Sequence, residues 1–91
     1  MKVVYSERAQ ADLASIREWF QERNPAAGRK VATELRRRLK LLQTQPQSGR
    51  LVDERPGIRE IVVGNYVIPY RADEHSILVL RVWHGRQDRD G

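Results

Sequence analysis

The residues best suited to chemistry lie in the C-terminal stretch Arg81–Arg89, which reads "RVWHGRQDR". Its histidine, His84, can donate or accept a proton near neutral pH. Cleavage of RNA by its own 2′-hydroxyl needs a base, an acid for the leaving oxygen and cations that stabilise the phosphorane. His84 together with Arg59 and Arg81 could supply such a catalytic set. The same residues also fit a strand end that carries charge to a binding surface, so the stretch leaves two alternatives open.

Charge is the strongest compositional signal in this chain of 91 residues. Lysine and arginine number 17 against 12 acidic residues, which gives a net charge of +5 and a pI near 10.2. Nearly all of these cations are arginines, which make planar, two-point contacts with phosphates and carboxylates. We therefore expect a polyanion or an acidic protein as partner, although a basic surface can also serve solubility alone.

The composition also excludes several classes of site. Cysteine is absent and the only histidines are His75 and His84, so we expect no disulfide, no metal site and no cofactor. No apolar run is long enough to span a bilayer, and Glu7 and Arg8 interrupt any signal-peptide core. A glycine-rich phosphate loop and a nucleophile elbow are also missing. The sequence predicts a soluble, cytoplasmic protein with a single domain over residues 1–91.

The first half of the chain has the periodicity of two amphipathic helices. Ser6 can cap a helix from Glu7 to about Glu22, and Asn24 can cap a second helix that starts at Pro25 and runs to about Thr44. The apolar stripe of the first helix consists of Ala9, Leu13, Ile16 and Phe20. That of the second consists of Val31, Leu35, Leu39 and Leu42. Because the connection is so short, the two helices must form a hairpin.

The rest of the chain reads as strands. A short strand is expected at Lys2–Tyr5, and three more follow the helices, at Ile58–Val63, Tyr66–Ala72 and Ser76–His84. Gly64-Asn65 is a plausible two-residue turn, and Pro69 predicts a bulge or an unpaired position inside its strand. The predicted fold is α+β with the order βααβββ, a helical hairpin packed on a small, mostly antiparallel sheet.

Strict alternation along the last strand predicts which of its side chains share a face. Ile77, Val79, Arg81 and Trp83 are expected on one face, and Leu78, Leu80, Val82 and His84 on the other. Arg59 and Arg71 come from the adjoining strands, so we expect them to gather with Arg81 into a cluster of guanidinium groups.

Two large apolar residues do not fit the buried stripes of the helices. Trp19 stands at the rim of the first stripe and Leu41 lies off the second. Such residues can be ordinary satellite packing, or they can line a groove on the hairpin that accepts a partner helix. Arg36 and Lys40, on the cationic side of the second helix, could add contacts with an acidic partner.

These segments, in this order, resemble the RelE/ParE superfamily of toxins from bacterial type II toxin–antitoxin modules. The resemblance covers nearly the whole chain and rests on "VVYSERAQADLASI", "NPAAGRKVATELRRRLKLL", "PGIREIVVGNYVIPYR" and "ILVLRVWHGRQDR". It implies the same βααβββ fold and a cognate antitoxin that is encoded next to the toxin and neutralises it in a hetero-oligomer. Trp19, Leu41, Arg36 and Lys40 are then the expected antitoxin contacts.

The resemblance is closer to the ParE branch, whose better-known members inhibit DNA gyrase and are not nucleases. "NYVIPYR" and "WHGRQD" carry this likeness, and Tyr66 stands where the mRNA-cleaving branch has an arginine. It implies a non-enzymatic gyrase inhibitor with a role in plasmid stabilization. Its expected target contacts are Arg71, Arg81, Trp83, His84 and Arg86. The alternatives are a ribosome-dependent mRNA endoribonuclease that uses Arg59, Arg81 and His84, and a degenerate, non-toxic binding module.

Overall fold

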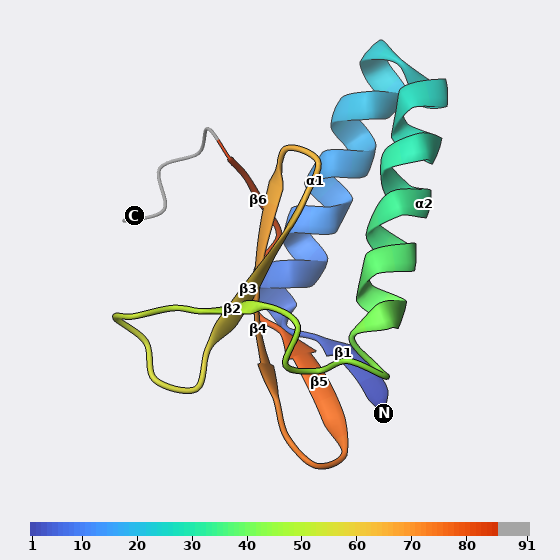
Figure 1. Cartoon of the computed structure of the whole chain (residues 1–91). Coiled ribbons are helices and arrows are strands. Elements are labelled where there is room, and N and C mark those ends of the chain that lie inside the picture. The colour runs from blue at the N-terminus through green and yellow to red at the C-terminus, as the bar shows by residue number, and fades with distance from the viewer. Residues whose placement is uncertain (86–91) are drawn as a thin grey trace.

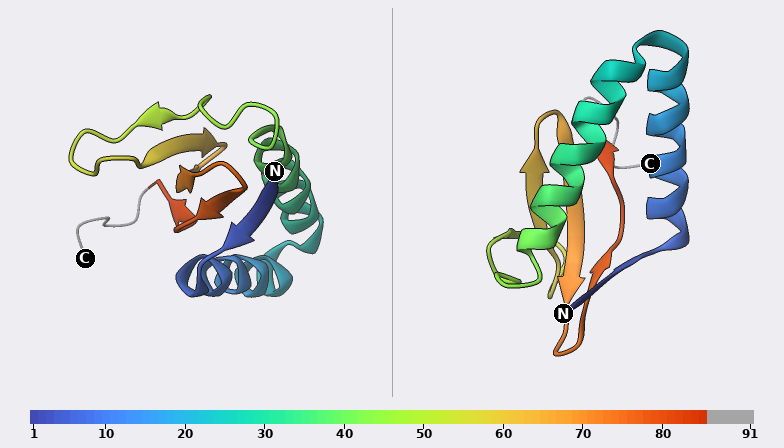
Figure 2. Two further views of the ribbon diagram at one scale, coloured as in Figure 1. Left: turned by 90° about the horizontal axis from the view of Figure 1, so that it is seen from below. Right: turned by 90° about the vertical axis from the view of Figure 1, so that its right-hand side faces the viewer.

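The computed structural model of the chain describes residues 1–85 and consists of a helical hairpin on one face of a sheet (Figure 1). The elements are β1 (Lys2–Tyr5), α1 (Glu7–Arg23), α2 (Pro25–Leu41), β2 (Arg50–Leu51), β3 (Arg59–Val63), β4 (Tyr66–Ala72), β5 (Ser76–Val79) and β6 (Trp83–His84). The views in Figure 2 show that both helices lie on the same side of the strands. The expected α+β arrangement is therefore confirmed.

The sheet has the order β1-β5-β4-β3-β2, and β6 pairs with β4. β1 runs parallel to β5, and the other strand pairs among the described residues are antiparallel, which agrees with the expected mostly antiparallel sheet. Parallel strands need a long connection, and here the helical hairpin and the strands that follow it connect β1 to β5. The short strand β2, in the loop after α2, was not expected from the sequence.

The helices begin where the capping residues predict. The Ser6 hydroxyl accepts a hydrogen bond from the Ala9 N–H at 3.0 Å, and the Asn24 side chain accepts one from the Ala27 N–H at 3.1 Å. α2 ends at Leu41, three residues earlier than expected, because the next N–H groups bond to carbonyls three residues back. Residues 42–44 therefore form a tighter turn at the end of the helix.

The core lies between α2, the N-terminal part of α1 and the central strands. Its buried members are Ala9, Leu35, Leu39, Leu42, Ile61, Val63, Tyr66, Ile68, Tyr70, Ile77, Val79 and Val82. α2 contributes Leu35 and Leu39, and Leu42 follows at its C-terminal cap, whereas Ala9 is the only fully buried residue of α1. Leu13 and Ile16 pack against this core but are only partly buried. The apolar stripe of α1 is therefore incompletely covered, and its exposed part borders a groove.

The last strand expected from the sequence is interrupted, and the prediction of one strand over Ser76–His84 is wrong. β4 pairs with β5 at Tyr70↔Val79 and with β6 at Val67↔Trp83. Two residues of β4 lie between these pairs, but three residues, 80–82, lie between them on the other side. The chain between β5 and β6 thus contains one extra residue, which is the definition of a β-bulge.

Pro69 lies opposite this bulge. Its carbonyl accepts a hydrogen bond from the Leu80 N–H at 2.9 Å. The nitrogen and carbonyl of one residue in an antiparallel strand point to the same neighbour, so the missing proline N–H falls in the gap between β5 and β6. The expected unpaired position at Pro69 is confirmed only on the side of β5 and β6, because Pro69 pairs with Glu60 on its other side, and the extra residue of the bulge belongs to the opposite strand.

The bulge changes which residues face the helices. His84 lies opposite Tyr66, a core residue, so it is on the face covered by the helices. Val82 is in the core as well. Trp83 lies opposite Val67 and is on the outer face, away from Ile77 and Val79. The alternation predicted through the whole strand is therefore wrong beyond Leu80, because one extra residue exchanges the two faces.

None of the helices within residues 1–85 has both the length and the apolar character to cross a membrane.

Candidate functional site

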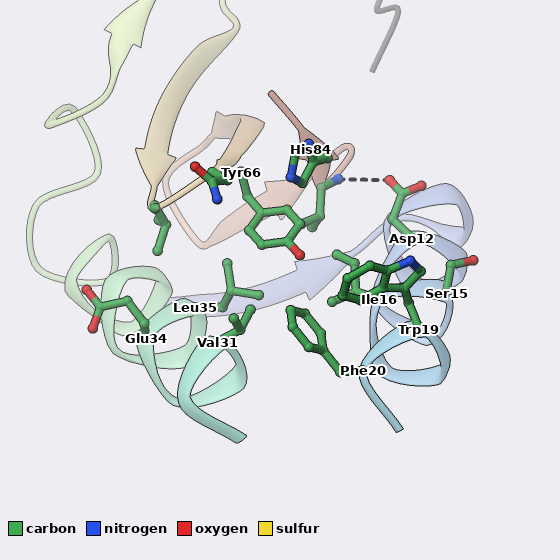
Figure 3. A pocket seen from close by; sticks show the side chains of 14 residues that line it. Asp12, Ser15, Ile16, Trp19, Phe20, Val31, Glu34, Leu35, Tyr66 and His84 are labelled. Carbon is green, nitrogen blue, oxygen red and sulfur yellow. Dashed lines mark hydrogen bonds between the residues drawn. The ribbon is translucent and has the colours of Figure 1, made fainter. Parts of the chain in front are cut away.

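A groove of about 780 Å³ opens where the helical hairpin meets the end of the sheet that holds the β3–β4 turn and β6. One wall comes from the helices and consists of Ile16, Trp19, Phe20, Val31 and Leu35; the other comes from the sheet and consists of Val63, Tyr66, Val82 and His84. Asp12, Ser15, Glu34 and Asn65 add polar groups. Figure 3 shows Tyr66 and His84 on the sheet side and Trp19, Phe20 and Ile16 across from them. We call this site the Trp19–His84 groove.

Trp19 is the most prominent side chain of the helical wall. It is 51% exposed, which is unusual for so large an apolar side chain. The Phe20 ring stands edge-on to it at 5.0 Å between centroids, and the Arg23 guanidinium lies 4.5 Å from its centroid. These contacts restrict the indole while leaving part of its surface open. A partly restrained, exposed tryptophan is well suited to anchor a bound protein segment.

Tyr66 and His84 form the aromatic part of the sheet wall. Their rings are perpendicular, with centroids 5.5 Å apart. Burial raises the pKa of the Tyr66 phenol above its usual value. Near neutral pH the phenol is therefore protonated, and its hydroxyl can donate and accept hydrogen bonds but does not act as a ready base.

Asp12 of α1 joins the helix to the chain around the bulge. Its carboxylate accepts from Arg81 Nε at 2.8 Å and from the second Arg81 nitrogen, Nη2, at 3.0 Å. It also accepts from the Val82 N–H at 2.8 Å, a bond drawn in Figure 3. The hydrogen bond to Asp12 raises the pKa of Arg81. The sequence offered no signal for this contact, which joins residues 69 positions apart.

The residues of the expected nuclease set do not meet. Arg59 lies opposite Tyr70, whereas His84 lies opposite Tyr66, four residues or about 13 Å away along β4. The Arg59 guanidinium donates to the Gly49 carbonyl at 2.9 Å and so holds the loop after α2. The third member, Arg81, is paired with a carboxylate. No shared position for a phosphate is formed by these three side chains within the described part of the chain.

The expected target contacts are also spread over different surfaces. Arg71 is exposed and, like Trp83, lies on the outer face of the sheet, whereas His84 lines the groove. The Arg81 guanidinium lies 5.1 Å from the Trp83 ring centroid while it is bound to α1. Arg86 lies outside the described residues. The cluster of Arg59, Arg71 and Arg81 predicted from the sequence is not formed, because Arg59 shares a face with Tyr70 and its neighbour Arg71 does not.

The four expected antitoxin contacts lie at separate places on the hairpin. Trp19 lines the groove, and Arg36 lines a second groove of about 440 Å³ between the two helices. Leu41 is 44% exposed at the far end of α2, on the order of 18 Å from Trp19 along the hairpin axis. Lys40 is exposed beside it. The sequence had suggested that Trp19 and Leu41 could line one groove. In the structure only Trp19 lines the Trp19–His84 groove.

Comparisons with known proteins give a consistent result. Residues 3–89 match the family model described as ParE toxin of type II toxin-antitoxin system, parDE. Toxin RelE1 of Caulobacter vibrioides is 36% identical over 91 residues, with 96% of each chain covered. Toxin RelE2 of the same organism is 33% identical over 84 residues, covering 91% of this chain and 93% of the relative. The solved structure titled chromosomal ParDE TA system from P. aeruginosa has a TM-score of 0.77 at 25% identity, covering 92% of this chain and 95% of its own.

Fold, groove and relatives together define a toxin component of a type II toxin–antitoxin system, a class in which each toxin is paired with an antitoxin. Within that class, the chain belongs to the ParE toxin family of parDE systems.

Proposed function

We propose that this toxin inhibits DNA gyrase by protein–protein binding, without catalysing a reaction, and that a cognate antitoxin encoded beside it neutralises it. The observation that carries the non-catalytic part is the separation of Arg59 from His84, whose partners on β4 lie four residues apart. A general acid or base must reach the proton it transfers within about 2.6–3.2 Å, and the cations must reach the same phosphate. Gyrase as the target rests on the likeness to the ParE branch.

The antitoxin contact is proposed to include the Trp19–His84 groove, with Arg36, Leu41 and Lys40 as further contacts along the hairpin. The groove has an apolar floor and an exposed tryptophan, the combination that favours an amphipathic helix. The P. aeruginosa relative is by its title part of a ParDE toxin–antitoxin system, which supports a hetero-oligomer for this chain as well.

A ribosome-dependent mRNA endoribonuclease remains the second candidate, because the two relatives from C. vibrioides are both named RelE toxins. On this alternative His84, beside Tyr66 in the groove, transfers a proton, and the ribosome and mRNA are the partners.

The test uses purified toxin with gyrase, relaxed plasmid and ATP, and in parallel a translating extract with a reporter mRNA. We expect inhibited supercoiling and an intact mRNA. Trp83→Ala should weaken the inhibition and keep antitoxin binding, because it removes an aromatic contact from the outer face. The matched variant Trp19→Ala should do the reverse. The nuclease alternative predicts mRNA cleavage that falls by about 10²–10⁴-fold in His84→Ala, the usual loss for a removed acid or base.

A further inference from the structure

The chain between β5 and β6 has backbone groups that the sheet does not satisfy. At the bulge, Leu80 and Val82 lie outside the paired registers of β4 with β5 and β6. Two side chains that reach these groups come from the start of α1 and its cap. The Ser6 hydroxyl donates to the Leu80 carbonyl at 2.7 Å, and the Asp12 carboxylate accepts from the Val82 N–H at 2.8 Å. Two backbone polar groups of this segment are thus satisfied by α1 and its cap.

Asp12 does more than accept this one bond. The same carboxylate binds the Arg81 guanidinium through two nitrogens, at 2.8 and 3.0 Å. The side chains of the pair are only 16% and 25% exposed, so water screens them less than it screens a surface ion pair. β6, in contrast, is held to β4 by only two residue pairs. The three bonds to Asp12 therefore fix a segment that has little sheet pairing of its own.

We propose that Asp12 is a positioning residue that holds Arg81–His84 in the one-residue offset from which Trp83 faces the target while His84 lines the Trp19–His84 groove. In this offset His84 faces Tyr66 and Trp83 faces outward. A register continuous with β5 would exchange the two faces. The consequence for the target rests on the gyrase binding proposed above, whereas the positioning itself rests on the contacts alone.

The test compares Asp12→Ala and Asp12→Asn with Glu22→Gln, which removes another α1 carboxylate that also pairs with an arginine, Arg23. Amide hydrogen exchange is measured at Val82 and at core positions such as Ile68, and ring contacts between Tyr66 and His84 are followed by NMR. In Asp12→Ala, exchange at Val82 should rise by about tenfold or more, since a hydrogen bond to a charged group is lost. Exchange in the core should rise less, and the ring contact should weaken.

Asp12→Asn keeps an acceptor for the Val82 N–H but loses the charge that binds Arg81, so it should be intermediate. It also decides the question if Asp12→Ala does not fold. Glu22→Gln should match the wild type. In the gyrase assay, the half-inhibitory concentration should rise by about tenfold for Asp12→Ala, because the loss of one hydrogen bond to a charged group changes an equilibrium constant by about that factor. Binding to the antitoxin should fall as well, because Asp12 and His84 both line the Trp19–His84 groove.

Unchanged Val82 exchange and an unchanged ring contact would overturn the positioning role, whatever gyrase does. Equal acceleration at Val82 and Ile68 would also overturn it, because Asp12 would then support only global stability. A loosened segment with full gyrase inhibition would remove the link to the target. If the wild type itself leaves gyrase active, the proposed target is wrong, and the exchange and NMR results still decide the role of Asp12.

Discussion

Arg59, a candidate catalytic residue, and Tyr70 both have a structural role in the loop after α2. Arg59 holds the loop after α2 through the Gly49 carbonyl. The fully buried Tyr70 holds the same loop: its hydroxyl accepts from the Gly49 N–H at 2.9 Å and donates to the Pro46 carbonyl at 2.8 Å. A Cβ on residue 49 would lie 2.6 Å from that hydroxyl oxygen, which explains a glycine there. The loop is therefore fixed by buried hydrogen bonds.

Tyr70→Phe should lower the free energy of unfolding by about 1–3 kcal/mol, because the buried Gly49 N–H loses its partner. Urea denaturation of both proteins measures the difference. Tyr5→Phe is the control, since no hydrogen bond of the Tyr5 hydroxyl is found within residues 1–85, and it should change stability much less. Equal stability of Tyr70→Phe and wild type would show that water replaces the lost partner.

Asp73 is expected to make the stability of the β4–β5 turn depend on pH. Its carboxylate accepts from the His75 N–H at 2.8 Å and the Ser76 N–H at 2.7 Å, and these bonds lower its pKa. A carboxyl with a lowered folded-state pKa adds stability that is complete above its unfolded pKa, near 3.9, and is lost as pH falls through the lower folded value.

On acidification from about pH 5 to pH 2, the wild type should therefore lose more stability than Asp73→Asn, which has no charge to neutralise. Urea denaturation of the two proteins over this range is the measurement. Parallel pH curves for both would contradict a role of the Asp73 charge in the turn.

At the scale of elements, the two helices differ in how completely they are buried. α2 packs Leu35 and Leu39 into the core, whereas α1 leaves Ile16 and Phe20 partly exposed and Trp19 half exposed beside the groove. An element that does not bury its own apolar stripe has area left for a partner, which is why the antitoxin contact is proposed there.

Trp19→Asp should weaken antitoxin binding by about 2 kcal/mol or more, because a charge would replace an apolar anchor in the groove. Leu41→Asp should weaken it less, and the two effects should add, since the residues lie far apart on the hairpin. Calorimetry on folded variants measures both. The control is Leu51→Asp, at an exposed leucine of β2, which should bind normally. Normal affinity of Trp19→Asp would exclude the groove as a major contact.

At the scale of the whole molecule, the chain combines a small core with a net charge of +5. The proposed target surface around Trp83 and the proposed antitoxin contact at Trp19 lie on different sides of the sheet. Asp12 of α1, the helix that carries Trp19, binds the segment next to Trp83. One domain can in this way present a partly independent surface to each partner.

Expression of the toxin alone should therefore arrest bacterial growth, and expression with the neighbouring antitoxin gene should restore it. Trp83→Ala should reduce the arrest while the protein stays soluble and still binds antitoxin, because only the target contact is weakened. Growth curves with immunoblots of the soluble fraction measure this. Normal growth with verified soluble wild-type protein would contradict the proposed toxicity.

The sequence by itself determined both helices and the order of the main strands, but neither β2 nor the break between β5 and β6. Ser6, Asn24 and Pro25 set the helix starts through local hydrogen bonds and a fixed φ, and the apolar stripe of α2 identified Leu35 and Leu39 as core. β4 was predicted with its observed bounds, Tyr66–Ala72. These features depend on neighbours in the chain, so they can be read from a local pattern.

Only the tertiary structure decided which residues share a site. The bulge at residues 80–82 leaves the alternation of side-chain types unchanged, yet it exchanges the faces of Trp83 and His84. The contact of Asp12 with Arg81 spans 69 positions and follows from where α1 crosses the sheet. Contacts of this kind depend on strand register and on helix placement. Packing of the whole core sets both, so no single segment of the sequence predicts them.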